Sequence, residues 1–253
     1  MSQTQHIYGL HAVRALLRQG DTQILRAWAL DSRHDPRLET LVGELQTQGI
    51  KVERLSRREL DRRVEADARH QGILLEIAGG VPVDDHDLDG FLARLKQPAL
   101  ILVLDGITDP HNLGACLRSA DAAGVQAVIL PKDKSASITP VVRKVASGAA
   151  ETLPVFTVTN LARALRSLKD AGVWLYGAAG EADQSLYEID FTGPTALVLG
   201  AEGDGLRRLT REHCDALVKI PMAGSVESLN VSVATGVLLF EVVRQRRGRG
   251  SRS

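Results

Sequence analysis

The sequence has few cysteines, few aromatic residues and no long hydrophobic run. Its two cysteines, Cys116 and Cys214, lie far apart without a Cys-x-x-Cys or histidine pattern beside them, which argues against a disulfide framework and against a zinc site. No apolar run approaches the ~18 residues of a membrane span, and the N-terminus lacks the hydrophobic stretch of a signal peptide. We therefore expect a cytoplasmic protein without a metal site.

An excess of charge of one sign is also missing. The 253 residues include 31 Lys and Arg and 31 Asp and Glu, so the net charge gives no support for a nucleic-acid partner. The C-terminal end differs, because a Gly- and Ser-spaced tail carries five arginines: Arg244, Arg246, Arg247, Arg249 and Arg252. Such a tail either follows a phosphate backbone or serves solubility, and the pattern leaves both open.

Residues 1–78 predict a small α/β domain. Apolar residues at helical spacing mark helices at 10–17 and 38–45, and strand-like runs cover 24–30 and 73–78. A Ser-x-x-Glu capping box, Ser56 and Glu59, predicts the start of a third helix. Its arginines, with acidic residues interleaved, are better explained as a solvated face than as an RNA contact.

Residues 79–98 read as a linker, because 79–90 hold three glycines, a proline and four aspartates without an apolar period. Beyond it, 99–253 alternates helical patterns with short apolar runs. The runs cover 100–105, 127–130, 155–156, 173–178, 195–200 and 216–220. This alternation predicts an α/β domain with a parallel sheet covered by helices on both faces.

Three unusual stretches follow predicted strands, where open α/β sheets place their ligands. The first runs from Leu104-Asp105-Gly106 to Ala120 and contains Asp-Pro-His-Asn-Leu-Gly-Ala at 109–115. Asn112 would lie near a helix start, where free N–H groups attract anions, and Arg118 about two turns further on. Taken alone, Asn112 is better explained as a helix cap and Arg118 as a solvated or salt-bridged side chain.

The other two stretches lie late in the chain. Leu-Gly-Ala-Glu-Gly-Asp-Gly-Leu at 199–206 is a strand entering a glycine-rich turn that holds Glu202; a plain tight turn explains it equally well. From Ile220-Pro-Met to Ser-Leu-Asn-Val-Ser-Val-Ala at 228–234, a loop of small residues enters a helix. We expect Ser228 to cap that helix, Asn230 to lie in its first turn, and a buried stripe at Leu229, Val233, Val237 and Phe240.

Together these stretches resemble the SpoU, or TrmH-type, branch of the SPOUT superfamily of S-adenosylmethionine-dependent RNA ribose 2′-O-methyltransferases. The resemblance covers about residues 99–245, with one family motif in each stretch and Arg118 completing the first. Segments 7–13 and 70–77 are further similar to the subgroup that methylates a guanosine ribose in bacterial large-subunit rRNA, whose extra domain resembles small kink-turn-binding ribosomal proteins. Position 201 is Ala where many relatives carry Asn.

The resemblance implies a fold, a partner and a set of site residues. It implies a deep trefoil knot between about 173 and 240 that forms the cofactor pocket, and a homodimer for which the helix at 228–240 is our candidate interface. Five residues would form the catalytic set: Asn112, Arg118, Glu202, Ser228 and Asn230. Five others would hold the cofactor: Leu199, Gly200, Ile220, Met222 and Leu229.

Methyl transfer from a sulfonium to a hydroxyl is an in-line displacement, which needs alignment rather than a metal. Family proposals assign deprotonation of the hydroxyl to the arginine that matches Arg118. Because a guanidinium does not ordinarily lose its proton, we expect Arg118 to hold a phosphate and stabilise the developing alkoxide. A solvent or phosphate oxygen then accepts the proton.

We expect a guanosine of large-subunit rRNA as the substrate, with tRNA or another rRNA site as the alternative. A non-catalytic RNA-binding relative would have lost Arg118 or Asn112, and both are present. A nicotinamide enzyme would need Gly-x-Gly-x-x-Gly after an early strand, whereas the spacing here is Gly-x-x-Gly-x-Gly on a late one.

Overall fold

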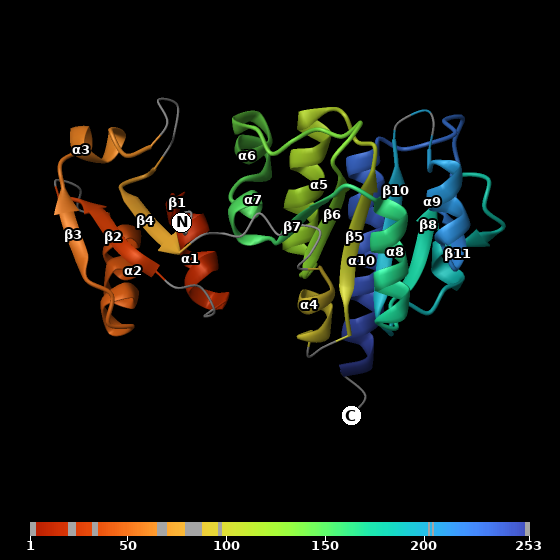
Figure 1. Cartoon of the computed structure of the whole chain (residues 1–253), viewed down its shortest axis with the longest axis horizontal. Coiled ribbons are helices and arrows are strands. Elements are labelled where there is room, and N and C mark those ends of the chain that lie inside the picture. Colours follow the sequence, from red (N-terminus) through yellow and green to blue (C-terminus); the bar gives the residue numbers. More distant parts are fainter. Residues whose placement is uncertain are drawn as a thin grey trace. The chain divides into compact units, whose positions relative to one another are not determined.

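The structure is a computed structural model that describes residues 4–19, 24–31, 35–64, 70–78, 88–95, 98–201, 203 and 205–250. The chain divides into two compact units, Met1–Val81 and Pro82–Ser253 (Figure 1). Each unit has its own hydrophobic core.

The N-terminal unit is a four-stranded sheet with helices. Its elements are β1 (Thr4–Tyr8), α1 (Leu10–Gln19), β2 (Ile24–Leu30), α2 (Pro36–Thr47), β3 (Val52–Leu55), α3 (Arg57–Asp61) and β4 (Ile73–Ala78). The strand order is β1-β4-β2-β3, with β4 antiparallel to both neighbours and β3 parallel to β2. The predicted capping box is present, since Glu59 accepts a hydrogen bond from the Ser56 backbone N–H at 2.9 Å.

The C-terminal unit contains a seven-stranded sheet in the order β7-β6-β5-β10-β8-β11-β9, and each neighbouring pair is parallel. The strands are β5 (Leu100–Asp105), β6 (Ala127–Pro131), β7 (Val155–Val158), β8 (Trp174–Ala178), β9 (Gln184–Ser185), β10 (Thr195–Gly200) and β11 (Ala216–Lys219). The helices are α4 (Leu88–Ala93), α5 (Pro110–Ala122), α6 (Pro140–Ala146), α7 (Ala149–Thr152), α8 (Leu161–Asp170), the short 3-10 helix η2 (Leu186–Glu188), α9 (Arg208–His213) and α10 (Val231–Gly250).

Alternate residues of β5 enter two different cores. Leu102 and Leu104 pack in the core that includes residues of α5, α6 and α10, whereas Ile101 and Val103 pack in the core that includes residues of α4 and α8. Because successive strand residues point to opposite faces, the sheet has helices on both faces, which confirms the predicted architecture.

The interpretation of 79–98 as a linker did not anticipate α4. Leu88 and Leu92 of α4 are buried in the core that contains Ile101, and the Phe91 ring meets the Phe156 ring edge-on at 5.2 Å between centroids. Residues 88, 91 and 92 have helical spacing, but the surrounding aspartates and glycines obscured it. The C-terminal unit therefore includes structure before residue 99; residues 79–87 and 96–97 lie outside the described part.

The arginine-rich C-terminus was also expected to be a tail, whereas α10 continues to Gly250. The Arg246 guanidinium donates hydrogen bonds to the carbonyls of Phe191, Pro98, Ala99 and Gly193 at 2.7–3.2 Å. Burial lowers the pKa of Arg246. Arg244 forms an ion pair with Glu241. The side chains of Arg244 and Arg246 therefore make contacts within the chain.

Both cysteines are free. Cys116 is buried beside Thr235, and burial raises the pKa of Cys214 to about 12. Cys116 is therefore a core residue, whereas Cys214 is half-buried against the core. Among the described helices, none combines the length and apolarity that a membrane crossing requires.

Candidate active site at the carboxyl ends of the strands

The strand order reverses between β5 and β10. From β5 the chain continues to β6 and β7 on one side, whereas β10, β8 and β11 lie on the other. A crevice forms outside the carboxyl ends of parallel strands at such a switch point. Two adjacent cavities lie there, and both are lined by Ala201, Gly205 and Val231.

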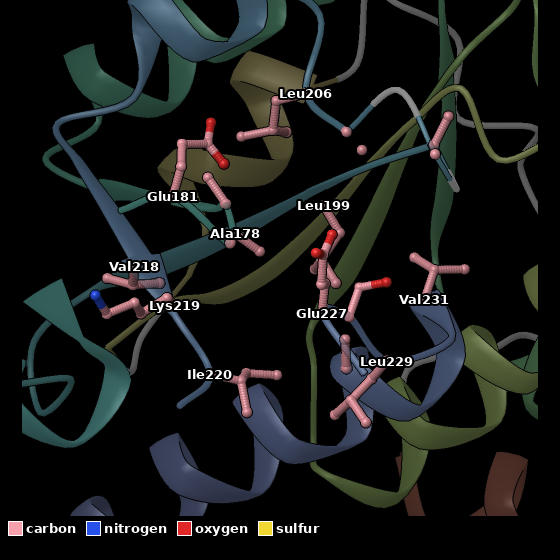
Figure 2. A pocket seen from close by; sticks show the side chains of 18 of the residues that line it. Ala178, Glu181, Leu199, Leu206, Val218, Lys219, Ile220, Glu227, Leu229 and Val231 are labelled. Atoms are coloured by element: carbon pink, nitrogen blue, oxygen red, sulfur yellow. The ribbon is translucent and has the colours of Figure 1, made fainter. Parts of the chain in front are cut away.

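The first cavity has a volume of about 520 Å³ and lies at the ends of β8, β10 and β11. All five residues predicted to hold the cofactor line it: Leu199, Gly200, Ile220, Met222 and Leu229. Figure 2 shows the side chains of Leu199, Ile220 and Leu229 around this cavity. Apolar side chains beside strand-end backbone groups suit a flat ring that also forms hydrogen bonds.

A tight turn after β10 forms one wall of the first cavity. The backbone N–H of Gly205 donates to the carbonyl of Ala201 at 3.0 Å, and Gly203 and Gly205 have φ values of 84° and 65°. A Cβ at position 200 would lie 2.0 Å from the Gly205 carbonyl carbon. Only glycine fits at Gly200 while the turn is closed. Glu202, predicted to be catalytic, lies outside the described residues.

Charged side chains also line the first cavity. Arg211 at α9 forms an ion pair with Glu181, which follows β8. Lys219 and Glu227 line the cavity as well (Figure 2). Both signs of charge are therefore available to a ligand with charged ends.

The third motif begins α10, but its cap is not the predicted one. Asn230 Oδ1 accepts hydrogen bonds from the Ser232 backbone N–H at 2.9 Å and from its hydroxyl at 2.6 Å. The prediction of Ser228 as the cap was wrong by two residues, because the helix begins at Val231 and asparagine caps as well as serine. Ser228 lines the first cavity instead.

Asn112 is brought to Asn230 by the fold. Its helix α5 is capped by Asp109, whose carboxylate accepts from the His111 backbone N–H at 3.0 Å, so Asn112 is not the cap. Asn230 Nδ2 donates to Asn112 Oδ1 at 3.1 Å, although the two residues are 118 positions apart. This amide pair joins the first and third motifs.

The second cavity, of about 680 Å³, lies between the ends of β5 and β10. Asn112 lines this cavity and Asn230 lines the first, so the amide pair stands where the two cavities meet. Asp105, Lys134 and Arg207 also line the second cavity. A ligand group that contacts the amide pair would therefore lie close to ligands bound in either cavity.

The sequence analysis placed Asp105 in the first stretch without assigning it a role, and it missed Arg207. Asp105 ends β5 with no exposed area, and its Oδ1 accepts a hydrogen bond from Arg207 Nε at 2.6 Å. This hydrogen bond raises the pKa of Arg207, which stays protonated. The available signal was an aspartate at the end of the apolar run 100–104, since a carboxylate buried on a strand requires a partner.

Arg118 lies elsewhere. It is exposed on α5, lines neither cavity, and forms no hydrogen bond or ion pair with any residue that the structure describes. Of the five predicted catalytic residues, Asn112, Ser228 and Asn230 therefore lie at the cavities, and Arg118 does not reach them within one chain.

Two family models match the chain. The SpoU rRNA Methylase family matches residues 99–240, and the RNA 2′-O ribose methyltransferase substrate binding family matches residues 6–79. Among curated proteins, the 23S rRNA (guanosine-2′-O-)-methyltransferase RlmB of Pseudomonas putida is 57% identical over 98% of this chain and 99% of its own length. The RlmB of Haemophilus influenzae is 54% identical over 97% and 99%.

Solved structures share the architecture. The SpoU methyltransferase AviRb from Streptomyces viridochromogenes, in complex with the cofactor AdoMet, superposes with a TM-score of 0.71 at 25% identity and covers 97% of this chain and 91% of its own. The A. aeolicus TrmH/SpoU tRNA modifying enzyme has a TM-score of 0.56 at 31% identity and covers 65% and 83%.

Proposed function

Because the chain belongs to the SpoU rRNA methylase family, we propose that it transfers a methyl group from S-adenosylmethionine to the ribose 2′-hydroxyl of a guanosine in 23S rRNA. The observation that carries the chemistry is that the five predicted cofactor residues line one cavity, joined by Asn112–Asn230 to a second. The substrate comes from RlmB relatives that match nearly the whole chain.

The first cavity fits the cofactor. Its volume lies within the ordinary range for such ligands, and Leu199, Ile220 and Leu229 offer an apolar slot for adenine. The Glu181–Arg211 pair supplies both charges for the ammonium and carboxylate of the methionine end. S-adenosylmethionine supplies the activated methyl group when bound.

The residues of the chain position the acceptor. The side-chain amides of Asn112 and Asn230 can donate to or accept from a ribose hydroxyl where the cavities meet. Arg118 holds a phosphate and stabilises the developing alkoxide while its guanidinium stays charged. A solvent or phosphate oxygen takes the proton, so alignment supplies much of the rate.

We further propose that the protein acts as a homodimer through α10. Val233 and Phe240 are 51% and 50% exposed and lie seven residues apart, with Gly236 between them, so they share one face of the helix. A Cβ at Gly236 would lie 3.9 Å from the Ser119 hydroxyl, so this part of α10 lies beside α5, the helix that carries Arg118. A dimer formed here brings Arg118 to the partner subunit, which explains why it lies outside both cavities of its own chain.

The N-terminal unit favours rRNA over tRNA as the substrate. The A. aeolicus tRNA enzyme corresponds to only 65% of this chain, whereas the RlmB relatives span both units. We assign RNA selection to residues 1–78, and an rRNA substrate places the reaction in the cytoplasm.

Mapping of ribose methylation tests the function. Mass spectrometry of 23S rRNA from cells with and without the gene should show one guanosine that loses its 2′-O-methyl group, and the purified protein with S-adenosylmethionine should restore it. An unchanged 23S rRNA methylation pattern, or a loss confined to tRNA, would contradict the assignment.

A further inference from the structure

We propose that the second cavity takes the base of the acceptor nucleotide and that Asp105 recognises guanine there through the hydrogen-bond donors of its N1 and N2 edge. This inference rests on the proposed function, which makes the acceptor a guanosine. It assigns substrate selection to a residue outside the three family motifs.

The first observation is an unbonded carboxylate oxygen. Asp105 is fully buried and its Oδ1 is held by Arg207, but Oδ2 is buried without a hydrogen-bond partner in the part of the chain that the structure describes. Leaving a charged acceptor buried and unpaired is costly. Such a group in a native fold requires an explanation, and a ligand that supplies the missing donor is one.

The second observation is the position of Asp105 beside the two cavities. Asp105 lines the second cavity together with Asn112, which bonds to Asn230 at the wall of the first. The ribose hydroxyl must face the methyl donor in the first cavity, so the base of the same nucleotide has the second cavity available to it. That cavity, about 680 Å³, lies at the switch point between β5 and β10 and has room for a nucleoside.

Guanine is also chemically complementary to the Asp105 carboxylate. A carboxylate only accepts hydrogen bonds, and guanine presents N1–H and the N2 amino group side by side, whereas adenine presents the N1 acceptor. Arg207 fixes the carboxylate through Oδ1, which leaves Oδ2 for the base. Because Oδ2 is covered in the chain without RNA, the cavity wall must shift on binding, a change common among complexes.

Lys134 gives the cavity a second, non-selective contact. Its side chain is exposed and lines the cavity, so its ammonium suits a phosphate next to the acceptor. A phosphate contact affects all bases equally. Lys134→Gln should therefore weaken RNA binding without changing the preference between bases.

Base analogues test the proposal in the unmodified protein. A synthetic RNA centred on the mapped guanosine is compared with RNAs that carry inosine, 2-aminopurine riboside or adenosine at that position. Inosine lacks the N2 amino group, 2-aminopurine lacks N1–H, and adenosine lacks both. We expect kcat/KM to fall at least about tenfold for one of the first two analogues, since a hydrogen bond to a charged group is lost, and to fall furthest for adenosine.

The Asp105→Asn variant tests the residue. Its Oδ1 can still accept from Arg207, while an NH2 group replaces Oδ2 and faces the N1 acceptor of adenine. We expect the guanosine-to-adenosine ratio of kcat/KM to fall at least about tenfold. Glu241→Gln is the matched control, because Glu241 is another buried carboxylate paired with an arginine but lines neither cavity; its ratio should not change.

Three results separate the possibilities. Equal slowing of guanosine and adenosine by Asp105→Asn would mean that Asp105 only anchors Arg207, and would overturn the proposal. If the variant does not fold, the analogues decide: inosine and 2-aminopurine both as reactive as guanosine would overturn it. No methylation of natural 23S rRNA by the unmodified protein would overturn the proposed function itself, and this inference with it.

Discussion

Arg118 and Gly200 serve the site in two different ways. Arg118 is exposed on α5 and acts, in our proposal, only when RNA and a second subunit are present. Gly200 serves the site because it has no side chain, since any Cβ there would collide with the turn that follows. The two residues therefore predict different kinetic consequences.

Arg118→Ala should lower turnover by roughly 10²–10³-fold, because a charge-assisted contact made mainly in the transition state is lost. Affinity for S-adenosylmethionine, measured by calorimetry with chelator present, should barely change. Arg163→Ala, an exposed arginine on α8, should leave both quantities unchanged. A parallel fall in turnover and cofactor affinity for Arg118→Ala would make it a binding or folding residue.

Gly200→Ala should abolish measurable cofactor binding, since the added Cβ would lie 2.0 Å from a backbone carbon and force the turn open. Calorimetry gives the affinity and circular dichroism reports whether the sheet is retained. Gly193→Ala is the control, because nothing lies within 4 Å of the Cβ it would add. Normal cofactor binding by Gly200→Ala would refute the role of the closed turn.

At the scale of an element, α10 combines three tasks. Asn230 caps the helix and donates a hydrogen bond to Asn112. Arg246 holds its last turns to loop carbonyls, and Val233 and Phe240 form an exposed apolar face. The predicted buried stripe of Leu229, Val233, Val237 and Phe240 is wrong at Val233 and Phe240, whereas Val237 packs half-buried against the core. The residues that do fill the core from α10 are Val231, Leu238, Leu239 and Val242.

Arg246→Ala should destabilise the C-terminal unit by about 1–3 kcal/mol, because carbonyls lose a charged donor at a partly exposed site. Urea unfolding followed by circular dichroism measures this change. Arg247→Ala, at the exposed next position, should stay within about 0.5 kcal/mol of the unmodified chain. Equal losses for the two variants would show that the carbonyl contacts contribute nothing.

Phe240→Asp should dissociate the proposed homodimer, because a charge would be buried at the centre of the apolar face. Sedimentation velocity should then show a monomer, with loss of methyl transfer. Leu209→Asp adds a charge at another exposed apolar residue, on α9, and should leave the oligomeric state unchanged. An unmodified protein that sediments as a monomer at micromolar concentration would exclude this interface.

For the whole molecule, we predict a division of labour between the two units. A chain that begins at Pro82 should fold and bind S-adenosylmethionine, yet methylate 23S rRNA far more slowly at limiting RNA, because we assign RNA selection to residues 1–78. The chain must retain α4, since Leu88 and Leu92 complete the core.

Replacement of Arg247, Arg249 and Arg252 by Gln tests the competing hypothesis that the C-terminus binds RNA. If these arginines contact phosphates, their loss should reduce the salt dependence of RNA affinity. Equal affinity and rate for the short and full chains would refute the role of residues 1–78.

Much of the architecture follows from the sequence by itself. The strands at 100–105 and 195–200 have the predicted bounds, because buried strands are short apolar runs and their signal is local. The resemblance of the three motifs likewise led to the cofactor residues, which line one cavity. The trefoil knot implied by the same resemblance stays a prediction, since chain threading leaves no local pattern.

Only the tertiary structure decided which distant residues meet. The Asn112–Asn230 and Asp105–Arg207 pairs join positions 118 and 102 apart, and they depend on β5 and β10 being neighbours in the sheet. The capping position of Asn230 and the exposure of Phe240 were likewise settled by where α10 begins and how it packs. Hydrophobic periodicity depends on residues a few positions apart, so the sequence pattern indicates the helices and strands. Strand order depends on the burial of all these elements at once, so their packing creates the site.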